Sequence, residues 1–291
     1  MSKTNIRAAV KPIVQNSLAV RIVFRVVVGV ASLSLSGAAT LHAQSSPASA
    51  APTHEQSTKP HKLSEAPGYL ASGELNFLEV LPPVPVLQSP DDEADVDILR
   101  KWQQPANSQR WVLAVADATQ SYSQFDSAFG STISAASTPL LVHLLDRVEG
   151  DVGSSLVQAK QYFKRARPYQ RLQLDHVCQR TQAPEDSYPS GHATYGWAVS
   201  LVLAQVAPDR AQAVLARGRE FGESRIVCAN QYPSDVAGAQ ILATAALGMI
   251  GSKPEFKRDL SCAKQEHEVT LKTRDQIDPV CKSLSNQAVN R

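Results

Sequence analysis

The sequence predicts an all-α fold, a single-domain helical bundle, from two observations. From Asp91 onward long amphipathic stretches dominate, and the alternation of apolar and polar residues that marks strands is rare. The chain has 291 residues, 43% of them apolar, which is enough to bury one substantial core. Residues 1–66 have the composition of a leader and a linker, so we expect one helical domain at 67–252 and a polar, irregular tail at 253–291.

Seven stretches have the length and periodicity of helices. They are residues 92–103, 110–128, 139–149, 152–164, 190–206, 209–225 and 234–250. Ser190 and Ser234 are good N-cap residues for the stretches that they begin, and Pro208 suits the first turn of another. The sequence holds no internal repeat, dinucleotide-binding glycine motif, nucleotide-binding phosphate loop or serine-hydrolase elbow.

The N-terminus is typical of an exported protein. Residues 1–25 hold five basic side chains and no acid, an apolar run occupies 22–35, and small residues precede Ala43. We expect a signal peptide at 1–43 and a disordered linker, rich in Ser, Pro, Ala and Thr, at 44–66. The alternative is a membrane anchor, but the apolar run is short against the roughly 20 residues that a span needs. A periplasmic or secreted protein is the expectation that follows.

Loss of this leader changes the formal net charge from +2 to −3, so the charge does not favour nucleic acid as a partner. No later segment is apolar enough for a span, and we expect no stable membrane insertion once the leader is removed. Association into a homo-oligomer stays open at this point.

Four cysteines follow the leader, where disulfides can form and persist, and they allow three pairings. We favour Cys178 with Cys228 and Cys262 with Cys281, the second of which closes a short C-terminal loop. The spacings match no tetrahedral zinc pattern, so these thiols are not favoured as metal ligands.

Three clusters hold candidate functional residues. In the first, Lys160 and Arg167 lie seven residues apart, which is two helical turns, and Pro168 ends the helix. Both cations can therefore face one pocket. A solvated basic face is the alternative.

The second cluster, Ser190-Gly191-His192, begins a helix. Exposed amide N–H groups and the positive end of the helix dipole suit a bound phosphate there. His192, in the first turn, can aim its ring at the same anion and donate a proton to a leaving alkoxide. The alternative is a capping histidine with no chemistry.

The third cluster runs from Ser224 to Asp235. Arg225 offers a planar fork for two phosphate oxygens. Asp235, at the start of a helix, is placed to accept a hydrogen bond from the side chain four residues earlier, which is Gln231.

The order and spacing of these clusters form a pattern: Lys-x6-Arg-Pro, then Pro-Ser-Gly-His, then Ser-Arg with Asp ten residues beyond the arginine. It resembles the three-part signature of the phosphatidic-acid phosphatase type 2 and vanadium haloperoxidase superfamily. Within that superfamily the chain is most similar, over residues 67–250, to the secreted bacterial class A non-specific acid phosphatases. Further matching stretches are Tyr69-Leu70, Leu81-Pro82-Pro83, Arg110-Trp111, Asp117-Ala118, Arg147-Val148-Glu149-Gly150-Asp151 and Gly222-Glu223-Ser224-Arg225.

The resemblance implies a role for each matching residue. The family's phosphate-binding positions correspond to Lys160, Arg167, Ser190, Gly191 and Arg225. His192 corresponds to the acid that protonates the leaving group, and Asp235 to the residue that orients a nucleophilic histidine. No metal or other cofactor is implied, because cationic side chains and helix-end amides supply the stabilisation of charge.

The sequence departs from the family at the nucleophile, where it has Gln231. A carboxamide nitrogen cannot attack as imidazole does, because its lone pair is delocalised into the carbonyl. One hypothesis is an acid phosphatase that hydrolyses phosphate monoesters slowly, with water positioned by Gln231 and Asp235. The other is a pseudophosphatase that binds small phosphorylated molecules or free phosphate without turnover. A vanadium haloperoxidase is less favoured, because that family ties vanadate through the same histidine.

Overall fold

The computed structural model describes residues 66–103, 108–181, 183, 185–270 and 278–289, which belong to one compact unit. The predicted signal peptide and residues 44–65 of the predicted linker lie outside the described residues. Throughout the described ranges the chain forms helices and no β-strand, which confirms the all-α prediction. No single helix in these ranges is long and apolar enough to cross a membrane, although Pro233–Ile250 and Pro254–Glu268, bent by 100° at their junction, meet that test as a pair.

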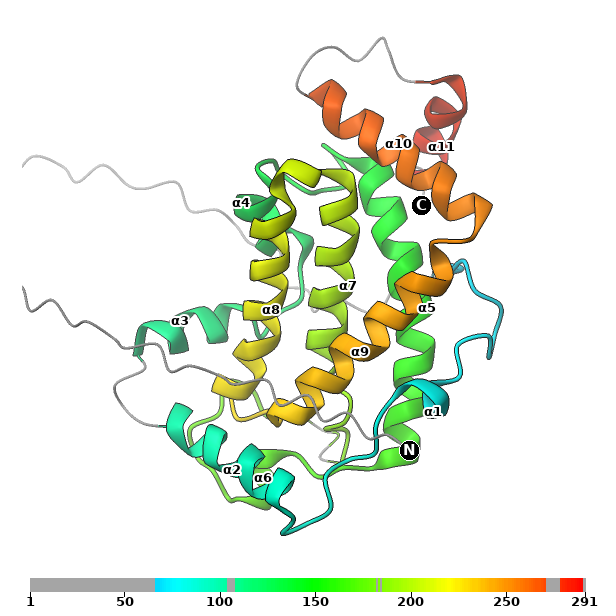
Figure 1. Ribbon diagram of the computed structural model, residues 1–291. Coiled ribbons are helices and arrows are strands. Elements are labelled where there is room, and N and C mark those ends of the chain that lie inside the picture. Colours follow the sequence, from blue (N-terminus) through cyan, green and yellow to red (C-terminus); the bar gives the residue numbers. More distant parts are fainter. Residues whose placement is uncertain (1–65, 104–107, 182, 184, 271–277, 290–291) are drawn as a thin grey trace, which may run out of the picture. The chain divides into compact units, whose positions relative to one another are not determined.

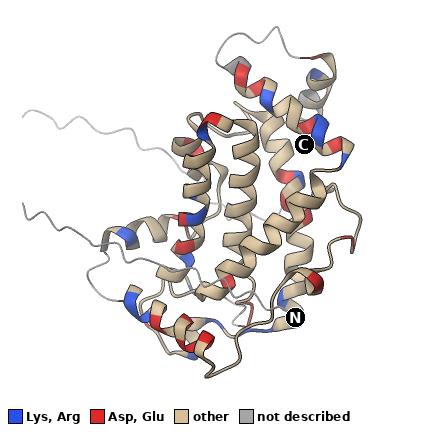
Figure 2. Cartoon of the chain, in the orientation of Figure 1, with Lys and Arg blue, Asp and Glu red and all other residues tan. Residues whose placement is uncertain are grey.

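Helix α7 (Gly191–Val206) is the central element of the bundle. Helices α5 (Pro139–Phe163), α8 (Ala211–Val227) and α9 (Pro233–Ile250) pack against it (Figure 1). Helix α7 has no charged residue (Figure 2), and its buried side chains lie on every face rather than along one stripe. A helix that is apolar all round is stable only inside a protein, so its sequence alone accounts for its central place.

The other described elements are mostly shorter and lie around these four helices. They are α1 (Phe77–Val80), α2 (Pro90–Trp102), α3 (Ser108–Ala116), a 3-10 turn at Tyr122–Phe125, α4 (Asp126–Phe129), α6 (Pro168–Arg171), a 3-10 turn at Pro208–Arg210, α10 (Pro254–Thr270) and α11 (Pro279–Val289).

The predictions of helices at 92–103 and 190–206 are confirmed to within two residues, and Ser190 caps α7 by accepting a hydrogen bond from the amide of Ala193. The stretch predicted at 209–225 is divided between a 3-10 turn and α8. The predicted cap Ser234 is wrong, because α9 begins after Tyr232 and the Ser234 hydroxyl donates instead to Asp95.

The predicted helices at 139–149 and 152–164 are one continuous helix, α5. Gly150 suggested a break, but its small size serves packing instead. A Cβ atom at Gly150 would lie 2.5 Å from the carbonyl oxygen of Ala66, so only glycine lets the N-terminal segment approach the helix there.

The helix predicted at 110–128 is broken after Ala116. Asp117, which directly follows α3, is buried and pairs with Arg217 of α8. Gln124 then forms a capping box with Ser121 at the start of the 3-10 turn. These polar contacts outweigh the helical periodicity of the segment, and the break brings the carbonyl of Ala118 against α7.

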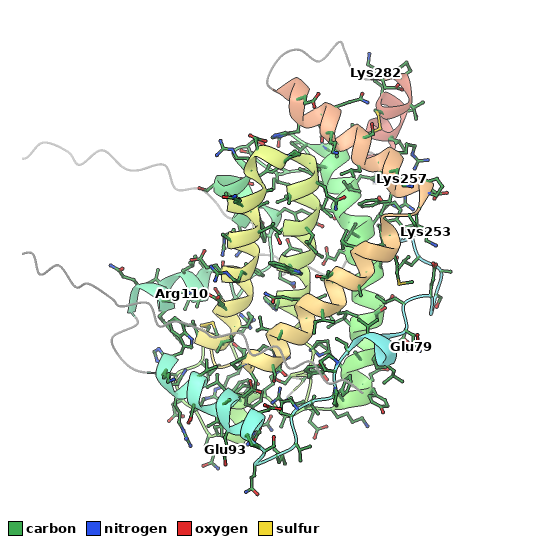
Figure 3. All side chains as sticks on the ribbon, in the orientation of Figure 1. Glu79, Glu93, Arg110, Lys253, Lys257 and Lys282 are labelled. Atoms are coloured by element: carbon green, nitrogen blue, oxygen red, sulfur yellow. A yellow bond between two sulfur atoms is a disulfide. The ribbon has the colours of Figure 1, made fainter. Side chains whose placement is uncertain are left out.

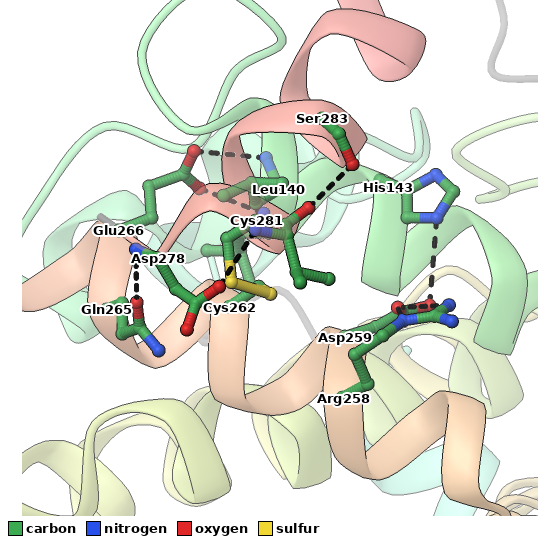
Figure 4. Close-up of a disulfide and its surroundings, with 12 residues drawn as sticks. Leu140, His143, Arg258, Asp259, Cys262, Gln265, Glu266, Asp278, Cys281 and Ser283 are labelled. Atoms are coloured by element: carbon green, nitrogen blue, oxygen red, sulfur yellow. Dashed lines mark hydrogen bonds and ion pairs between the residues drawn. A yellow bond between two sulfur atoms is a disulfide. The ribbon is translucent and has the colours of Figure 1, made fainter.

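The expectation of an irregular tail is wrong for residues 254–270 and 279–289, which form α10 and α11. Glu266 of α10 accepts hydrogen bonds from the amides of Leu140 and Leu141, at 3.0 and 2.9 Å, and so satisfies the first turn of α5 (Figure 4). The predicted pairing of Cys262 with Cys281 is confirmed and joins α10 to α11 (Figure 4). The predicted pairing of Cys178 with Cys228 is also confirmed.

Asp259 of α10 connects this C-terminal part to the rest of the bundle. Its Oδ2 atom accepts hydrogen bonds from the Tyr69 hydroxyl at 2.9 Å and from Arg147 Nη1 at 2.8 Å. Burial by itself raises the pKa of the Asp259 carboxyl, but contacts with His143, Arg258 and Tyr69 stabilise the charged form and lower the pKa to about 2. Asp259 is therefore ionised wherever the protein is folded at ordinary pH.

We expect Asp259 to make the stability of the fold acid-dependent. Its folded-state pKa of about 2 lies below the unfolded value of about 3.9. The contribution, about 2 kcal/mol, is therefore fully present above about pH 4 and is lost as the pH falls toward 2. In Asp259→Asn, the free energy of urea unfolding should be lower at pH 6 and should fall less steeply between pH 4 and 2. Asp97→Asn, on the exposed face of α2, is the control, and equal pH slopes in Asp259→Asn and the wild type would contradict this assignment.

Candidate functional site

One pocket gathers the residues of all three sequence clusters. Its volume is about 520 Å³. The predicted site residues that line it are Lys160, Arg167, Ser190, Gly191, His192, Arg225 and Gln231. The other lining residues are Gln120, Leu156, Gln179, Arg180, Thr181 and Asn230. Of the predicted site residues, Asp235 alone is absent from this wall.

The first cluster is placed by the end of α5. Lys164 has a positive φ of 46° and terminates the helix, so Lys160 lies in its last turn. Arg167 follows in the link to α6. Backbone carbonyls hold both cations, because Lys160 Nζ donates to the carbonyl of Asp186 and Arg167 Nε donates to that of Ala183 at 3.0 Å.

Lys160 is a cation whose charge depends on its surroundings. Burial, and then the nearby positive charge of Arg167, lower the pKa of Lys160 to about 7. An anion within a few ångströms favours the protonated form. Lys160 is therefore fully charged in acid, and it loses charge near neutrality unless an anion is bound beside it.

The second cluster forms the N-terminal end of α7. This helix of 16 residues starts at Gly191, and Ser190, Gly191 and His192 at its start line the pocket. Amide N–H groups at a helix N-terminus have no partner within the helix, and the helix dipole places partial positive charge there. The end of α7 is therefore suited to a bound oxyanion.

His192 is oriented by the segment that breaks the predicted helix. Its Nε2 atom lies 3.0 Å from the carbonyl oxygen of Ala118. A carbonyl can only accept, so Nε2 carries hydrogen, and Nδ1 is the atom that gains or releases the second proton. Burial, followed by the charge of Arg225, lowers the pKa of His192 well below 6.5. Acid conditions or a bound anion are needed to charge the ring.

Arg225 lies in the last turn of α8 and is buried. Its Nη1 atom has no hydrogen-bond partner among the described residues. Burial, and then Arg167, lower the pKa of Arg225 to about 10, so it stays charged at neutral pH. A buried, charged donor without a partner is costly, and it indicates a ligand that accepts hydrogen bonds.

A polar network behind Arg225 holds the end of α8 in place. Arg110, which extends from α3, donates to Ser224 Oγ at 2.9 Å and to the carbonyl of Glu220 at 2.8 Å (Figure 3). The Ser224 hydroxyl donates to Asp117 Oδ2 at 2.5 Å. Arg110 and Asp117 belong to stretches that match the family but have no role assigned by the sequence, and the structure shows that they brace Ser224, the residue before Arg225.

The predicted contact between Gln231 and Asp235 is absent. Gln231 Nε2 donates instead to the carbonyl of Asn230 at 2.7 Å. Gln231 lines the pocket, and its Oε1 atom is buried and has no hydrogen-bond partner among the described residues. Gln231 therefore has an acceptor oxygen without a partner, and position 231 offers an amide rather than a charged group to a ligand in the pocket.

Asp235 joins the three clusters from behind the pocket. Its carboxylate accepts hydrogen bonds from Ser187 Oγ at 2.6 Å, the amide of Tyr232 at 2.8 Å and Arg165 Nη1 at 2.6 Å. Its backbone carbonyl accepts from the amide of Ser190 at 3.0 Å. The prediction that Asp235 orients residue 231 is wrong in this chain, because the carboxylate is already engaged by these three donors.

Arg165 and Ser187 also support the site, although no sequence motif indicated either residue. Arg165 also pairs with Asp95 of α2 at 2.9 Å, and its guanidinium carbon lies 4.0 Å from the centre of the Tyr232 ring. Arg165 belongs to the same basic run as Lys160 and Arg167, but local sequence does not distinguish a cation that faces the pocket from one that braces it.

The pocket has the chemistry of a site for a tetrahedral oxyanion. Lys160, Arg167 and Arg225 supply positive charge, and the amides at the start of α7 supply directed donors. The described residues contain no group of three or more His, Cys, Asp or Glu that suits a metal ion. Fixed donors of this kind stabilise the negative charge that develops during phosphoryl transfer.

Known proteins are similar to this chain in sequence. Residues 126–255 match the model of the PAP2 superfamily. The chain is 31% identical over 220 residues to an acid phosphatase of Zymomonas mobilis, which covers 73% of this chain and 83% of the relative. It is 32% identical over 224 residues to a non-specific acid phosphatase of Providencia stuartii, covering 74% of this chain and 88% of the relative. A non-specific acid phosphatase of Salmonella typhimurium is 31% identical over 199 residues, which cover 64% of this chain and 78% of the relative. The chain belongs to the PAP2 superfamily and, within it, to the bacterial non-specific acid phosphatases.

Proposed function

We propose that this chain is an exported acid phosphatase that hydrolyses phosphate monoesters, and that its turnover is impaired because Gln231 replaces the family's nucleophile. One observation carries the proposal. A single pocket brings Lys160, Arg167 and Arg225 together with His192, and it has an amide side chain at position 231. The first four residues are what a phosphate monoester needs for binding and for departure of its alcohol.

The reaction that this geometry supports is direct attack by water. The cations and the α7 amides hold the phosphoryl oxygens, and Nδ1 of protonated His192 delivers its proton to the ester oxygen as the P–O bond breaks. Gln231 Oε1 accepts a hydrogen bond from the attacking water, as a glutamine orients water in GTP hydrolysis. One hydrogen of that water stays on the new P–OH group. The other is released to solvent, and His192 Nδ1 regains a proton from solvent before the next turnover.

We expect this route to be slow, since no carboxylate is among the described residues that line the pocket. The Asp235 carboxylate is engaged by three donors and does not line the pocket. Loss of a covalent nucleophile commonly reduces the rate by several powers of ten, while the electrostatic cage and the acid still contribute.

A phosphate-binding pseudophosphatase is the second candidate. The unpartnered Oε1 atom of Gln231 favours it, because this atom can hold a ligand but cannot attack phosphorus. Its ligands would be small phosphorylated molecules or free phosphate.

Export is supported by the two disulfides, Cys178–Cys228 and Cys262–Cys281, because such bonds persist in oxidising compartments. The basic and apolar pattern of residues 1–43 supports the same location.

The proposal is tested with purified residues 44–291, by hydrolysis of p-nitrophenyl phosphate at pH 5 and by calorimetric titration with phosphate. The impaired enzyme should show slow hydrolysis that disappears in His192→Ala, which controls for contaminating phosphatases. Phosphate binding without hydrolysis would identify the pseudophosphatase. Turnover of about 10 per second, ordinary for enzymes, would contradict impairment. Absence of both hydrolysis and binding would contradict both functions.

A further inference from the structure

Two amide side chains in the pocket wall have orientations that their neighbours determine. Gln231 Nε2 lies 2.7 Å from the carbonyl oxygen of Asn230, and Asn230 Nδ2 lies 2.7 Å from the carbonyl oxygen of Gln179. Carbonyl oxygens only accept hydrogen bonds, so reversal of either amide would set oxygen against oxygen. Gln231 Oε1 and Asn230 Oδ1 are therefore the atoms left free of these bonds.

Both oxygens are buried and unmatched. Gln231 is 2% exposed and Asn230 is 1% exposed, and both residues line the pocket. Neither Oε1 nor Oδ1 has a hydrogen-bond partner among the described residues. Buried acceptors are nearly always satisfied in folded proteins, so these two indicate a ligand that donates hydrogen bonds.

The same pocket also demands an anion. Lys160, Arg167 and Arg225 line it, and Arg225 Nη1 is a buried donor without a partner in the described residues. The ligand must therefore accept from cations on one side and donate to amide oxygens on another. A tetrahedral oxyanion that carries a hydroxyl group does both, whereas an oxyanion without a proton would be repelled by the bare oxygens.

We propose that Gln231 Oε1, supported by Asn230 Oδ1, makes this pocket selective for oxyanions that carry a hydroxyl, so that it binds phosphate and rejects sulfate. The inference rests on the proposed phosphate site and adds its specificity. Near neutral and acidic pH inorganic phosphate always has at least one P–OH group, and sulfate has none. Gln231 is thus a determinant of specificity even if it contributes nothing to turnover.

This selectivity also distinguishes the substrate from the product by whether each carries a P–OH group. A phosphate monoester has a P–OH group only as its monoanion, which is replaced by the dianion above a pKa of about 6. Inorganic phosphate keeps a hydroxyl in both forms. The P–OH group that Gln231 holds in the product contains the oxygen of the attacking water, so the acceptor that aligns water before the reaction binds phosphate after it.

The test compares two anions at one pH, because Lys160 and His192 also titrate in this pocket. Residues 44–291 are titrated calorimetrically with sodium phosphate and with sodium sulfate at pH 6 and constant ionic strength. Phosphate, mostly a monoanion at this pH, should bind at least about tenfold more tightly than the sulfate dianion. Coulombic attraction alone predicts the opposite order, since sulfate carries the larger charge.

Gln231→Leu removes the acceptor and keeps a side chain of similar size. In this variant the ratio of phosphate to sulfate affinity should fall about tenfold, to near unity. Gln179→Leu is the matched control, because Gln179 is an exposed glutamine of the same pocket and holds Asn230 through its backbone carbonyl. The affinity ratio of Gln179→Leu should equal that of the wild type.

The possible outcomes distinguish a failure of the proposed selectivity from a failure of the proposed phosphate site. Equal affinity of the wild type for both anions overturns the selectivity, whatever the variants do, and leaves the phosphate site standing. An unchanged ratio in Gln231→Leu, shown by thermal unfolding to be folded, overturns the role of Gln231. Binding of neither anion by the wild type overturns the proposed function together with this inference.

Discussion

Gln231→His should raise the rate of p-nitrophenyl phosphate hydrolysis at pH 5 by at least about a hundredfold over the wild type. The substitution places an imidazole in the wall of a pocket that is already lined by Lys160, Arg167, Arg225 and His192. The Asn230 carbonyl, which accepts from Gln231 Nε2 in the wild type, is available to accept the ring N–H. That contact would leave the lone pair of the other ring nitrogen free to attack phosphorus.

A new covalent route has signatures that a general increase in activity lacks. Gln231→His should form an alkali-stable, acid-labile phosphohistidine when the reaction is quenched rapidly in base, and the wild type should not. Gln231→Asn, which keeps an amide, is the control for a change of volume. Equally high activity in the wild type and Gln231→His would contradict the claim that Gln231 limits turnover.

Arg165→Met should lower the free energy of unfolding by about 4 kcal/mol, the largest loss that we expect from replacing one buried charged side chain. Arg165 lies between two buried carboxylates, at 2.9 Å from Asp95 and 2.6 Å from Asp235. Methionine fills the space but leaves both carboxylates without their cation, and an uncompensated buried charge is more costly than the loss of the pair as a whole. The melting temperature should fall by roughly 8–16 °C.

The pH dependence of this loss follows from Asp235. Burial raises the pKa of the Asp235 carboxyl, while Arg165, Ser187 and the Tyr232 amide favour its charged form. Without Arg165 the pKa rises further above its unfolded value, so the destabilisation should be smaller at pH 5 than at pH 8. Urea unfolding at both values measures it. Arg100→Met, at an exposed pair on α2, is the matched control with a cost of at most about 1 kcal/mol, and similar losses in the two variants would contradict the bracing role of Arg165.

The central helices and most of the site could be predicted from the sequence because their signals are local. Helix α7 is mostly apolar, has no Lys, Arg, Asp or Glu, and begins at a serine cap, and both features can be recognised within a stretch of 17 residues. Three short motifs, each at the end or start of a helix, contain seven predicted site residues among the thirteen residues that line the pocket. The choice of disulfide partners also agrees with the structure.

The errors occur where distant residues decide the local conformation. The helix predicted at 110–128 is interrupted where Asp117 meets Arg217, a partner 100 residues away, and α5 continues through Gly150 because a segment 84 residues earlier packs on it. Asp235 illustrates the same limit within the site. Spacing placed it four residues from Gln231, but its hydrogen bonds go to Arg165 and Ser187, 70 and 48 residues away.

The sequence by itself determined the helical class, the central helices, the residues that meet in the pocket and the glutamine at position 231, since periodicity, capping and motif spacing are properties of short stretches. The tertiary structure alone decided what these residues do to one another. It gave Asp235 a bond to Arg165, made the Ala118 carbonyl the acceptor that orients His192, and left the buried Gln231 Oε1 without a hydrogen-bond partner among the described residues. The physical reason is that a buried polar group takes whichever partner the packing of distant segments brings within hydrogen-bond reach, and local sequence does not specify that partner.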